Sequence, residues 1–431
     1  MIETEQSLGR LLEEAAELAE REGTWALVGF SEDVGDVDPL AAFAAAGMLR
    51  TFWRPPDTPA MVTSGTWMYG WSDTLPSTLR DHPQVGSPPV LTAAIPFDLR
   101  RVGGPWHGFQ FGLRLPRHVL HGRMLTSYAI VSSRRDLDAL ADGIMRYRRH
   151  LLSGWAAHNR NRGPTGSPRW QTFEPAVRAC LAAMPERGLR KVVPARAVEI
   201  PGRWDEETVL RRLDAAQPHC TVFADQRGTD HYFLGATPEW LARVHQGHAH
   251  VSCLAGTAPR GVTPEEDHAL GAALLADPKN RVEHALVLEM IREALHDLPV
   301  LEAESPQLMR LPHLQHLSTP LQVRDANILD LALRLHPTPA VAGLPVRDAM
   351  DLLREVESFD RGGYAGLVGW VDLAGNGELA VALRSALLHD GCATLYAGCG
   401  VVPGSLPADE ARESRLKLRP VLDALGVEGR E

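Results

Sequence analysis

The side chains of Glu410, Glu413 and Lys417 share one face of a helix that the sequence predicts near the C-terminus, because their spacing is i, i+3 and i+7. Ser405 is the predicted N-cap of this helix and Pro407 lies in its first turn. Two carboxylates and one ammonium group therefore converge. A solvated helix face with an ion pair between Glu413 and Lys417 explains the same spacing, and spacing alone favours that simpler interpretation.

A third carboxylate, Glu283, lies on the border of an apolar stripe in a helical region predicted over 267–298. A carboxylate that faces a core is costly unless it is paired or bound to a metal ion. A glutamate that extends to solvent beside His284 explains the position equally well. His313 and His316 have a spacing that could hold zinc, but no third Cys or His lies nearby, which favours ordinary polar histidines.

The segment before the C-terminal helix has the pattern of β-structure. Its apolar runs are short and rich in Val, Leu and Ala, and the Asn-Gly pair at 376–377 and the Asp-Gly pair at 390–391 are typical of hairpin turns. An antiparallel meander is therefore predicted, with strands at 367–373, 379–388 and 394–402.

Helices and strands are interleaved along the rest of the chain, which indicates an α+β fold. The loop 159–169 has no apolar repeat and is the candidate boundary between a first and a second part. The predicted helices cover 1–23, 137–157, 173–185, 205–217 and 267–298, and the predicted strands include 25–30, 61–69, 128–131, 191–200, 220–224, 230–235 and 240–244.

Composition excludes several classes of protein. The 431 residues are 44% hydrophobic and 23% charged, as in ordinary globular proteins, and no apolar run has the length of a membrane span. The formal net charge of −10 argues against nucleic acid as a partner and requires that any anion site gather Lys, Arg or a metal locally. Five cysteines without a C-x-x-C pair, and an N-terminus without an export signal, predict reduced thiols in the cytoplasm. Hydrolase and nucleotide-binding motifs such as HExxH, GxSxG and Walker A are absent.

Ten segments, taken together and in order, resemble the chorismate-utilising enzymes: isochorismate synthases, salicylate synthases, and the large subunits of anthranilate and aminodeoxychorismate synthases. The resemblance covers about residues 170–425 well and the first 150 or so only thinly. The matching segments are AIPFD (94–98), KVVPAR (191–196), FLGATPEWL (233–241), LAGTAPRG (254–261), KNRVEH (279–284), LQHLSTP (314–320), LHPTPAVAGLP (335–345), FDRGGYAGLVGW (359–370), ALRSA (382–386) and AGCGVVPGSLPADEARESRLK (397–417).

The resemblance implies an α+β fold in which large antiparallel β-sheets pack with helices around a central active-site cleft. It implies a single chorismate-binding domain over 1–431, with a divergent part at 1–157 and a motif-bearing catalytic part at 170–425. Chorismate is the implied small-molecule substrate and Mg²⁺ the implied cofactor, with neither nucleic acid nor membrane as partner. The family is often monomeric, so a monomer or a weak oligomer is expected.

The resemblance also implies roles for individual residues. Glu283 and Glu413 resemble direct Mg²⁺ ligands, and Glu410 resembles a residue that reaches the metal directly or through water. Mg²⁺ prefers such hard oxygens, and Arg384 offers a planar fork for a carboxylate of the substrate. The residues that resemble the substrate-binding set are Ala255, Gly256, Thr257, His316, Ala340, Arg384, Tyr396, Gly398, Gly400 and Lys417.

Isochorismate formation requires a base on one side of the ring and an acid on the other, because water attacks carbon 2 while hydroxide leaves carbon 4. By family position Lys191 is the base and Glu239 the acid. Lys191 must then be destabilised as an ammonium by burial or neighbouring cations, and Glu239 must be held protonated by apolar or anionic surroundings. Taken alone, Lys191 would be a solvent-facing strand end and Glu239 a turn residue.

The HPTPA phrase at 336–340 favours water over ammonia as the nucleophile, because it resembles isochorismate synthases, whereas aminating members share a PAGTxSG-like phrase. The predicted function is therefore Mg²⁺-dependent isomerisation of chorismate to isochorismate, without a glutamine amidotransferase subunit. Salicylate synthase, which goes on to eliminate pyruvate, is the alternative, although such enzymes generally carry Thr near Ala340. Cys399 replaces an expected Ala and is small enough to fit.

Two hypotheses from other classes remain. A catalytically inactive homologue that serves as a binding subunit is expected to lack Lys191, Glu239 or a metal carboxylate, and none of them is missing. A zinc hydrolase built on His313 and His316 predicts no dependence on Mg²⁺.

Overall fold

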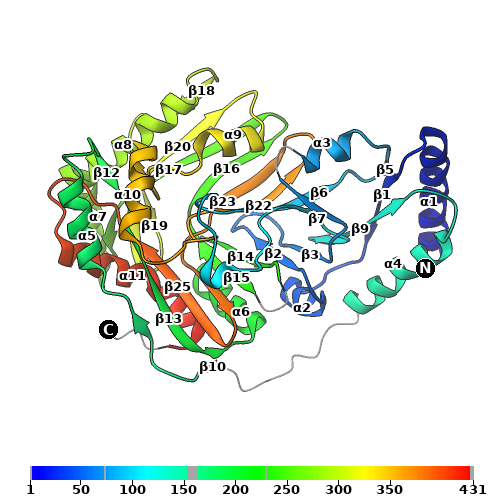
Figure 1. Ribbon diagram of the computed structural model, residues 1–431, viewed down its shortest axis with the longest axis horizontal. Helices are drawn as coiled ribbons and strands as arrows, with labels where there is room; N and C mark the ends of the chain where they lie inside the picture. The colour runs from blue at the N-terminus through cyan, green and yellow to red at the C-terminus, as the bar shows by residue number, and fades with distance from the viewer. Residues whose placement is uncertain (1, 72–73, 153–162, 229–230, 428–431) are drawn as a thin grey trace.

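Two large β-sheets form the centre of the molecule in the computed structural model, which describes residues 2–71, 74–152, 163–228 and 231–427 (Figure 1). The thirteen-stranded sheet is antiparallel except where β1 pairs with β5 in parallel. Its members are β1 (Ala26–Asp33), β2 (Thr51–Arg54), β3 (Met61–Ser64), β5 (Gln84–Gly86), β8 (His118–His121), β9 (Met124–Val131), β10 (Gly163–Pro164), β11 (Arg169–Trp170), β13 (Ala195–Arg203), β14 (Thr221–Gln226), β15 (Tyr232–Thr237), β24 (Ser385–His389) and β25 (Cys392–Gly398).

The second large sheet has ten strands, and a small third sheet pairs two short strands. The ten strands are β4 (Met68–Gly70), β6 (Val90–Ile95), β7 (Gly112–Leu115), β16 (Trp240–His245), β17 (His248–Pro259), β18 (Val300–Glu302), β19 (Gln307–Arg310), β20 (Leu314–Val323), β22 (Leu367–Asp372) and β23 (Gly377–Val381), and the pair is β12 (Lys191–Val192) with β21 (Gly343–Leu344).

Helices gather at both ends of the sheets (Figure 1). At one end lie α5, α7, α8, α10 and α11, and at the other α1 and α4. The helices are α1 (Ile2–Glu22), α2 (Pro39–Ala45), α3 (Leu75–Arg80), α4 (Leu137–Leu152), α5 (Glu174–Ala183), α6 (Glu206–Ala216), α7 (Pro264–Ala276), α8 (Pro278–Ala294), α9 (Ile328–Leu335), α10 (Val346–Val356) and α11 (Pro407–Leu425), with a 3₁₀ turn at Gly104–Trp106.

The main core lies between the two large sheets. The ring of Trp53 on β2 meets that of Trp240 on β16 edge to face at 5.7 Å, and Trp53 Nε1 donates to Glu378 Oε2 on β23 at 2.9 Å. Aromatic pairs of this kind add to the burial of apolar area that holds sheet against sheet. Separate apolar clusters join α2, α6 and α11 to the outer face of the thirteen-stranded sheet, and α1 and α4 to β1 and β9. These α+β layers confirm the predicted fold class.

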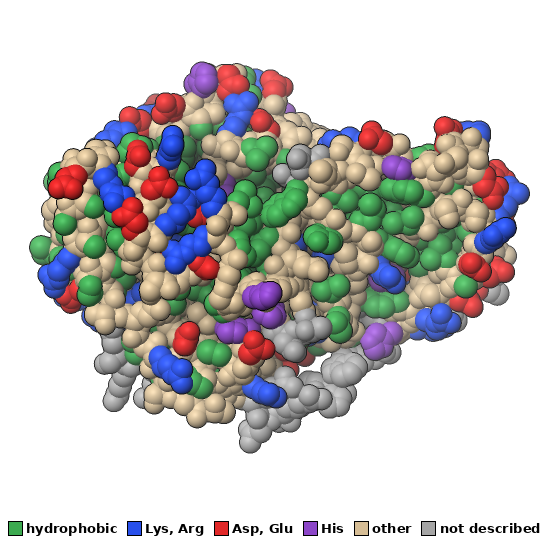
Figure 2. Space-filling model, in the orientation of Figure 1, with side chains coloured by type: hydrophobic (Ala, Val, Ile, Leu, Met, Phe, Trp, Pro, Cys, Tyr) green, Lys and Arg blue, Asp and Glu red, His purple; other side chains and the backbone are tan. Residues whose placement is uncertain are grey.

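In the face shown in Figure 2, charged side chains of both signs are interspersed over the end that holds α5, α7, α8, α10 and α11. Apolar side chains gather nearer the middle. Many of the charges form ion pairs. Arg354, for example, contacts Asp98 at 2.6 Å and Asp351 at 2.5 Å. The part of the chain that the structure describes contains no helix long and apolar enough to cross a bilayer.

The predicted meander differs from the structure in its second and third strands. The segment 379–388 is two strands, β23 and β24, which belong to different sheets. The chain changes sheet at Arg384, whose φ of +50° lies in the left-handed region that non-glycine residues rarely adopt. Backbone strain of this kind persists only where the surroundings hold it. The third predicted strand, 394–402, ends early because β25 stops at Gly398.

Other predicted elements also divide. The strand at 191–200 breaks at Pro194 into β12 and β13, since proline cannot donate to a central ladder. The helix at 267–298 is α7 and α8, and Asp277 is both the C-cap of the first and the N-cap of the second. Helix α11 begins after Leu406 rather than Ser405, because Ser405 Oγ instead accepts a hydrogen bond from Val402 N at 3.2 Å.

Strands from the first 131 residues complete both large sheets. β2 pairs with β14, and β6 pairs with β22, so neither sheet is confined to one part of the chain. The predicted boundary loop at 159–169 lies partly outside the described residues, and β10 and β11 at its end pair with β13. The single domain over 1–431, with parts 1–157 and 170–425, stays a prediction that this sharing of strands supports.

Candidate active site

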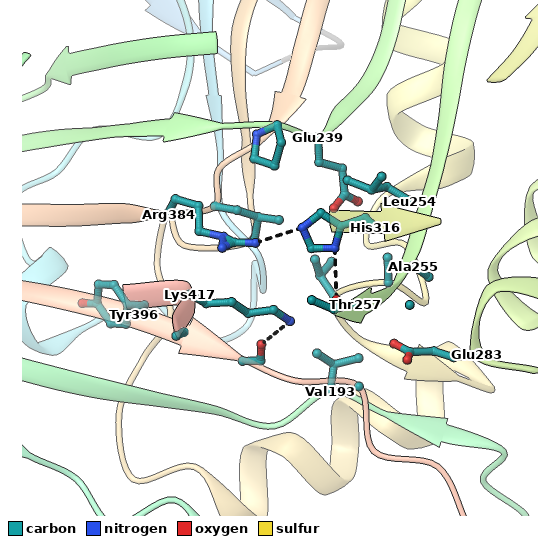
Figure 3. A pocket seen from close by; sticks show the side chains of 18 of the residues that line it. Val193, Glu239, Leu254, Ala255, Thr257, Glu283, His316, Arg384, Tyr396 and Lys417 are labelled. Atoms are coloured by element: carbon teal, nitrogen blue, oxygen red, sulfur yellow. Dashed lines mark hydrogen bonds between the residues drawn. The ribbon is translucent and has the colours of Figure 1, made fainter. Parts of the chain in front are cut away.

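A pocket opens where the two large sheets meet α8 and α11 (Figure 3). Twelve of the fifteen predicted site residues line it, whereas Lys191, Glu410 and Glu413 are not among the lining residues. The twelve are Glu239, Ala255, Gly256, Thr257, Glu283, His316, Ala340, Arg384, Tyr396, Gly398, Gly400 and Lys417. The lining residues that sequence reasoning missed are Val193, Pro238, Leu254, Val341, Tyr364, Leu383 and Ala397.

Arg384 points from the strand crossover towards His316 on β20 (Figure 3). Its guanidinium lies 3.4 Å from His316 Nε2, and His316 Nδ1 lies 3.0 Å from Thr257 Oγ1. Burial, reinforced by the charges of Arg384 and Lys417, lowers the pKa of His316 well below its ordinary value. The imidazole is therefore neutral, and it can accept from Arg384 only if Nδ1 carries the proton that it donates to Thr257.

The pocket wall on β17 contains a β-bulge between Ala255 and Thr257. Gly256 occupies the bulge with φ +83°, and a side chain there would meet Leu317 at 3.2 Å. The amide of Thr257, which is left out of the regular ladder, donates to Asn280 Oδ1 at 3.0 Å. The first turn of α8 therefore fixes the shape of this wall.

Lys417 projects from α11 into the pocket (Figure 3). Its Nζ lies 2.7 Å from Glu413 Oε1 and donates to Gly398 O at 3.1 Å. Burial acts to lower the pKa of Lys417, but the Glu413 carboxylate outweighs it and the pKa is raised. Burial likewise acts to raise the pKa of Glu413, and Lys417 lowers it overall. The i,i+4 ion pair expected from spacing is present, yet it forms at a pocket and not on a solvated face.

Glu410 lies one turn before Glu413 and is almost fully buried. Its Oε1 accepts from Lys279 Nζ at 2.6 Å. Burial and the neighbouring Glu413 raise the pKa of Glu410, because two close carboxylates resist joint ionisation. One oxygen from each carboxylate and the Cys399 thiol lie within 4.8 Å of one another.

Glu283, on α8, lies outside this group of three but lines the same pocket. Its Oε1 lies 3.0 Å from Lys191 Nζ, and a Cβ added to Gly400 would stand 2.1 Å from the same oxygen. Only glycine at 400 allows the carboxylate and the chain to approach so closely. Lys191 is fully buried, as predicted, but its nearest charged neighbour is a carboxylate and not the cation that the sequence analysis considered.

Glu239 lies on the other side of the pocket from Glu283 in the view of Figure 3. Burial raises the pKa of its carboxyl to about 7, against the opposing influence of Lys191, Lys417 and Arg384. The apolar setting predicted for it is confirmed, whereas the surrounding charges are cationic. A carboxyl with its pKa raised in this way keeps its proton at a higher pH than an exposed glutamate does, which suits a general acid.

Tyr396 presents its ring to the pocket, while its hydroxyl accepts from Trp106 Nε1 at 3.1 Å. Tyr364 stacks on it with the ring centroids 5.3 Å apart. Trp106 comes from the N-terminal part, for which sequence reasoning found no chemistry. Its connection to the pocket depends on contacts distant in sequence, so no local pattern could have revealed it.

The neighbouring carboxylates of Glu410 and Glu413 suit a hard divalent cation, and Glu283 stands against Gly400 beside them. Carboxylate oxygens from two helices converge on the segment Cys399 to Gly400, and burial of the Cys399 thiol raises its pKa well above the ordinary value, so the thiol stays neutral. The zinc alternative loses support because, among the residues that the structure describes, His313 and His316 belong to no such cluster.

The fold and the pocket define a class of enzyme. The sequence profile of the family described as "Chorismate binding enzyme" matches residues 12–426. The chain therefore belongs to the chorismate binding enzyme family.

Curated relatives are isochorismate synthases. The chain is 36% identical over 365 residues to isochorismate synthase MenF of Bacillus subtilis, an alignment that covers 81% of this chain and 77% of the relative. It is 39% identical over 271 residues to isochorismate synthase EntC of Escherichia coli, covering 60% of this chain and 68% of the relative.

The chain is also similar to a solved structure of an isochorismate synthase. The menaquinone-specific isochorismate synthase MenF from Escherichia coli superposes with a TM-score of 0.77 at 25% identity, over 95% of this chain and 99% of that one.

Proposed function

We propose that the chain is an isochorismate synthase, which adds water at carbon 2 of chorismate and releases the carbon 4 hydroxyl. The observation that carries the proposal is that two buried ionisable groups meet this pocket: Glu239 lines it, and Lys191 pairs with Glu283, which also lines it. The Glu239 carboxyl has a pKa of about 7, and Lys191 contacts Glu283 across the pocket from it. Relatives named isochorismate synthase support the same activity.

The cationic lining accounts for binding of a doubly anionic substrate by an acidic protein. Arg384 offers a planar fork for one carboxylate, held in place by the neutral His316. Lys417 supplies a second charge beside the backbone of Gly398. Gly256 and Gly400 both line the pocket, where a side chain at either position would crowd its neighbours. These residues are proposed to bind and orient chorismate.

Mg²⁺ is the proposed cofactor, held by Glu283 and Glu413 with Glu410 as a third ligand. When bound, the ion neutralises and fixes one substrate carboxylate. The carboxylates themselves are contributed by α8 and α11, so the relative position of these helices determines whether the site can form.

Two proton transfers complete the proposed reaction. Lys191, as the free amine, takes a proton from the attacking water, and Glu239 gives its proton to the departing hydroxyl at carbon 4. One water enters and one leaves, so substrate and product are isomers. In the structure the Lys191 ammonium lies 3.0 Å from Glu283 Oε1.

Water as nucleophile needs no ammonia supply, so we propose that the chain acts without a glutamine amidotransferase subunit, as a monomer or a weak oligomer in the cytoplasm. Salicylate formation is the second candidate, and Ala340, which lines the pocket near the place where salicylate synthases generally carry Thr, counts against it.

The test is incubation with chorismate and Mg²⁺, with products separated by chromatography and identified by mass. Isochorismate alone supports the proposal, salicylate with pyruvate supports the second candidate, and unchanged chorismate contradicts both. Lys191→Ala is expected to abolish water addition while far-UV circular dichroism stays that of the wild type. Retained turnover in this variant would assign the base to another residue.

A further inference from the structure

Three lysines face the three carboxylates proposed as metal ligands. Lys191 Nζ lies 3.0 Å from Glu283, Lys279 Nζ 2.6 Å from Glu410, and Lys417 Nζ 2.7 Å from Glu413. The formal charges of the three ammonium groups and the three carboxylates therefore cancel. A cluster of buried carboxylates is tolerated without a metal only when it is compensated in this way.

The three lysines differ in how firmly they are held. The Lys191 side chain is fully buried, and Lys417 has a second partner in Gly398 O. The Lys279 side chain is 38% exposed, and among the described residues its ammonium contacts Glu410 alone. Its flexible four-carbon stem can carry the ammonium into solvent. Lys279 is therefore the cation that can leave.

Lys279 also stands where its own helix disfavours a cation. It is the second residue of α8, and the first turn of a helix carries the positive end of the macrodipole. Within that turn no residue is acidic, and the nearby carboxylate of the N-cap Asp277 is occupied by hydrogen bonds from Asn280. The partner that accounts for the position of the ammonium is Glu410, on α11.

A divalent ion and Lys279 compete for the same carboxylate. Mg²⁺ binds oxygens at about 2.0–2.1 Å, and an ammonium that stays within hydrogen-bonding distance of Glu410 would lie beside the dication and repel it. We propose that Lys279 is the counter-ion of the metal site at rest and that the incoming metal displaces it from Glu410. The proposal rests on the proposed function, because it concerns the same metal site.

A lysine that stays on Glu410 when the metal binds predicts a change of the opposite sign in metal affinity. If Lys279 stayed on Glu410 as an outer partner that orients the carboxylate, its removal would weaken metal binding. As a displaced counter-ion, its removal leaves the resting site with an uncompensated negative charge and strengthens metal binding. The sign of the change in affinity therefore separates the two roles.

The experiment is titration of the full chain with Mn²⁺, with free Mn²⁺ followed by electron paramagnetic resonance. Lys279→Gln and Lys279→Met each remove the charge and shorten the side chain by one atom. Both are expected to lower the Kd for Mn²⁺ about tenfold, the effect of roughly one neighbouring charge at a partly exposed site. Arg412→Gln is the matched control. It removes an exposed cation from α11 that pairs with Asp409, and should leave the Kd within twofold.

An unchanged or higher Kd in both Lys279 variants overturns the counter-ion role while leaving the proposed function intact, provided that the wild type binds Mn²⁺ and converts chorismate. A wild type that binds no Mn²⁺ overturns the counter-ion role together with the metal site. Because Lys279 is partly exposed, either variant is sufficient if the other fails to reproduce the circular dichroism of the wild type.

Discussion

Burial raises the pKa of the Glu239 carboxyl and so suits it to act as a general acid. In sequence it lies in a turn between Pro238 and Trp240, where glutamate is normally solvated and ionised. In the structure the carboxyl is 6% exposed, and burial raises its pKa to about 7 although three cations stand nearby. Desolvation, which favours the neutral carboxyl, thus outweighs the charges of Lys191, Lys417 and Arg384, which favour the carboxylate. A site of this kind holds a proton without a dedicated hydrogen-bond partner.

The pH dependence of turnover tests the role of Glu239. The acid form must donate, and because the raised pKa is about 7, its population falls as the pH rises through 7. The rate of the wild type should therefore decline on the alkaline side. Glu239→Gln should lower kcat about 10²- to 10⁴-fold and remove that alkaline limb. Initial rates of isochorismate formation between pH 6 and 9 measure both effects.

Glu289→Gln is the control, because Glu289 is an exposed residue on α8 that pairs with Arg190. It should leave the profile unchanged. A Glu239→Gln enzyme that retains the alkaline limb would assign the acid to another group.

Gly400 is a second residue with a specific role, because there is no room for a side chain at this position. A Cβ at this position would lie 2.1 Å from Glu283 Oε1 and 3.0 Å from Lys191 Cε. Gly400→Ala should therefore move the carboxylate, lower kcat/KM for chorismate at least tenfold, and cost about 1–3 kcal/mol in unfolding free energy, as overpacking does. Steady-state kinetics and urea denaturation check these outcomes.

Gly143→Ala serves as the comparison, since a Cβ there meets nothing within 4 Å in α4. Helix propensity predicts equal or slightly greater stability for it. Wild-type turnover in Gly400→Ala would show that the close approach to Glu283 is dispensable.

At the scale of elements, the strand crossover positions the anion-binding arginine. The apolar content of β23 and β24 predicts a single strand, and the hairpin that joins β22 to β23 was correctly predicted, although its turn lies at 373–376 and Gly377 already belongs to β23. The break at Arg384 was missed because it depends on which sheet each strand joins, and that choice is made by partners distant in sequence. Twelve pocket residues were predicted from resemblance to a family rather than from periodicity, which supplies no spatial contacts.

The break between α7 and α8, in contrast, had a local signal. Pro278 follows Asp277, and a proline in the first turn after an acidic cap marks a helix start. The apolar periodicity continued across this point, although Val282 in this segment is 54% exposed. Periodicity was therefore given too much weight against the proline.

Asp277→Ala tests how far this cap serves the pocket. Asp277 Oδ2 accepts from Asn280 N at 2.8 Å and from Asn280 Nδ2 at 2.7 Å, and Asn280 in turn accepts from the amide of Thr257. Loss of a cap costs about 1 kcal/mol, and here it also frees Asn280. The KM for chorismate should rise as stability falls, as measured by kinetics and thermal unfolding.

Thr263→Ala removes the comparable cap of α7, where Thr263 accepts from Glu266 N at 3.2 Å. It should cost similar stability without altering KM. Equal KM values in the two variants would separate α8 capping from the pocket.

At the scale of the molecule, the N-terminal part and the motif-bearing part build the same sheets. β14 loses a neighbour without β2, and β22 loses one without β6, which would expose central strands as edges. Trp106 adds a direct link, because it packs on Phe233 and bonds Tyr396 in the pocket wall. The weak resemblance of the first 150 residues to the family therefore reflects a divergent sequence in shared architecture.

This sharing predicts that the chain unfolds as one unit. Calorimetry of the full chain should give a single transition with a calorimetric enthalpy close to the van't Hoff value, because neither part retains a complete sheet alone. A fragment that begins at residue 163 should lack a cooperative transition by the same argument. Two resolved transitions in the full chain, or a fragment that melts cooperatively, would mean that each part has a core sufficient for its own stability. The contacts of β2 and β6 would then join two domains that fold separately.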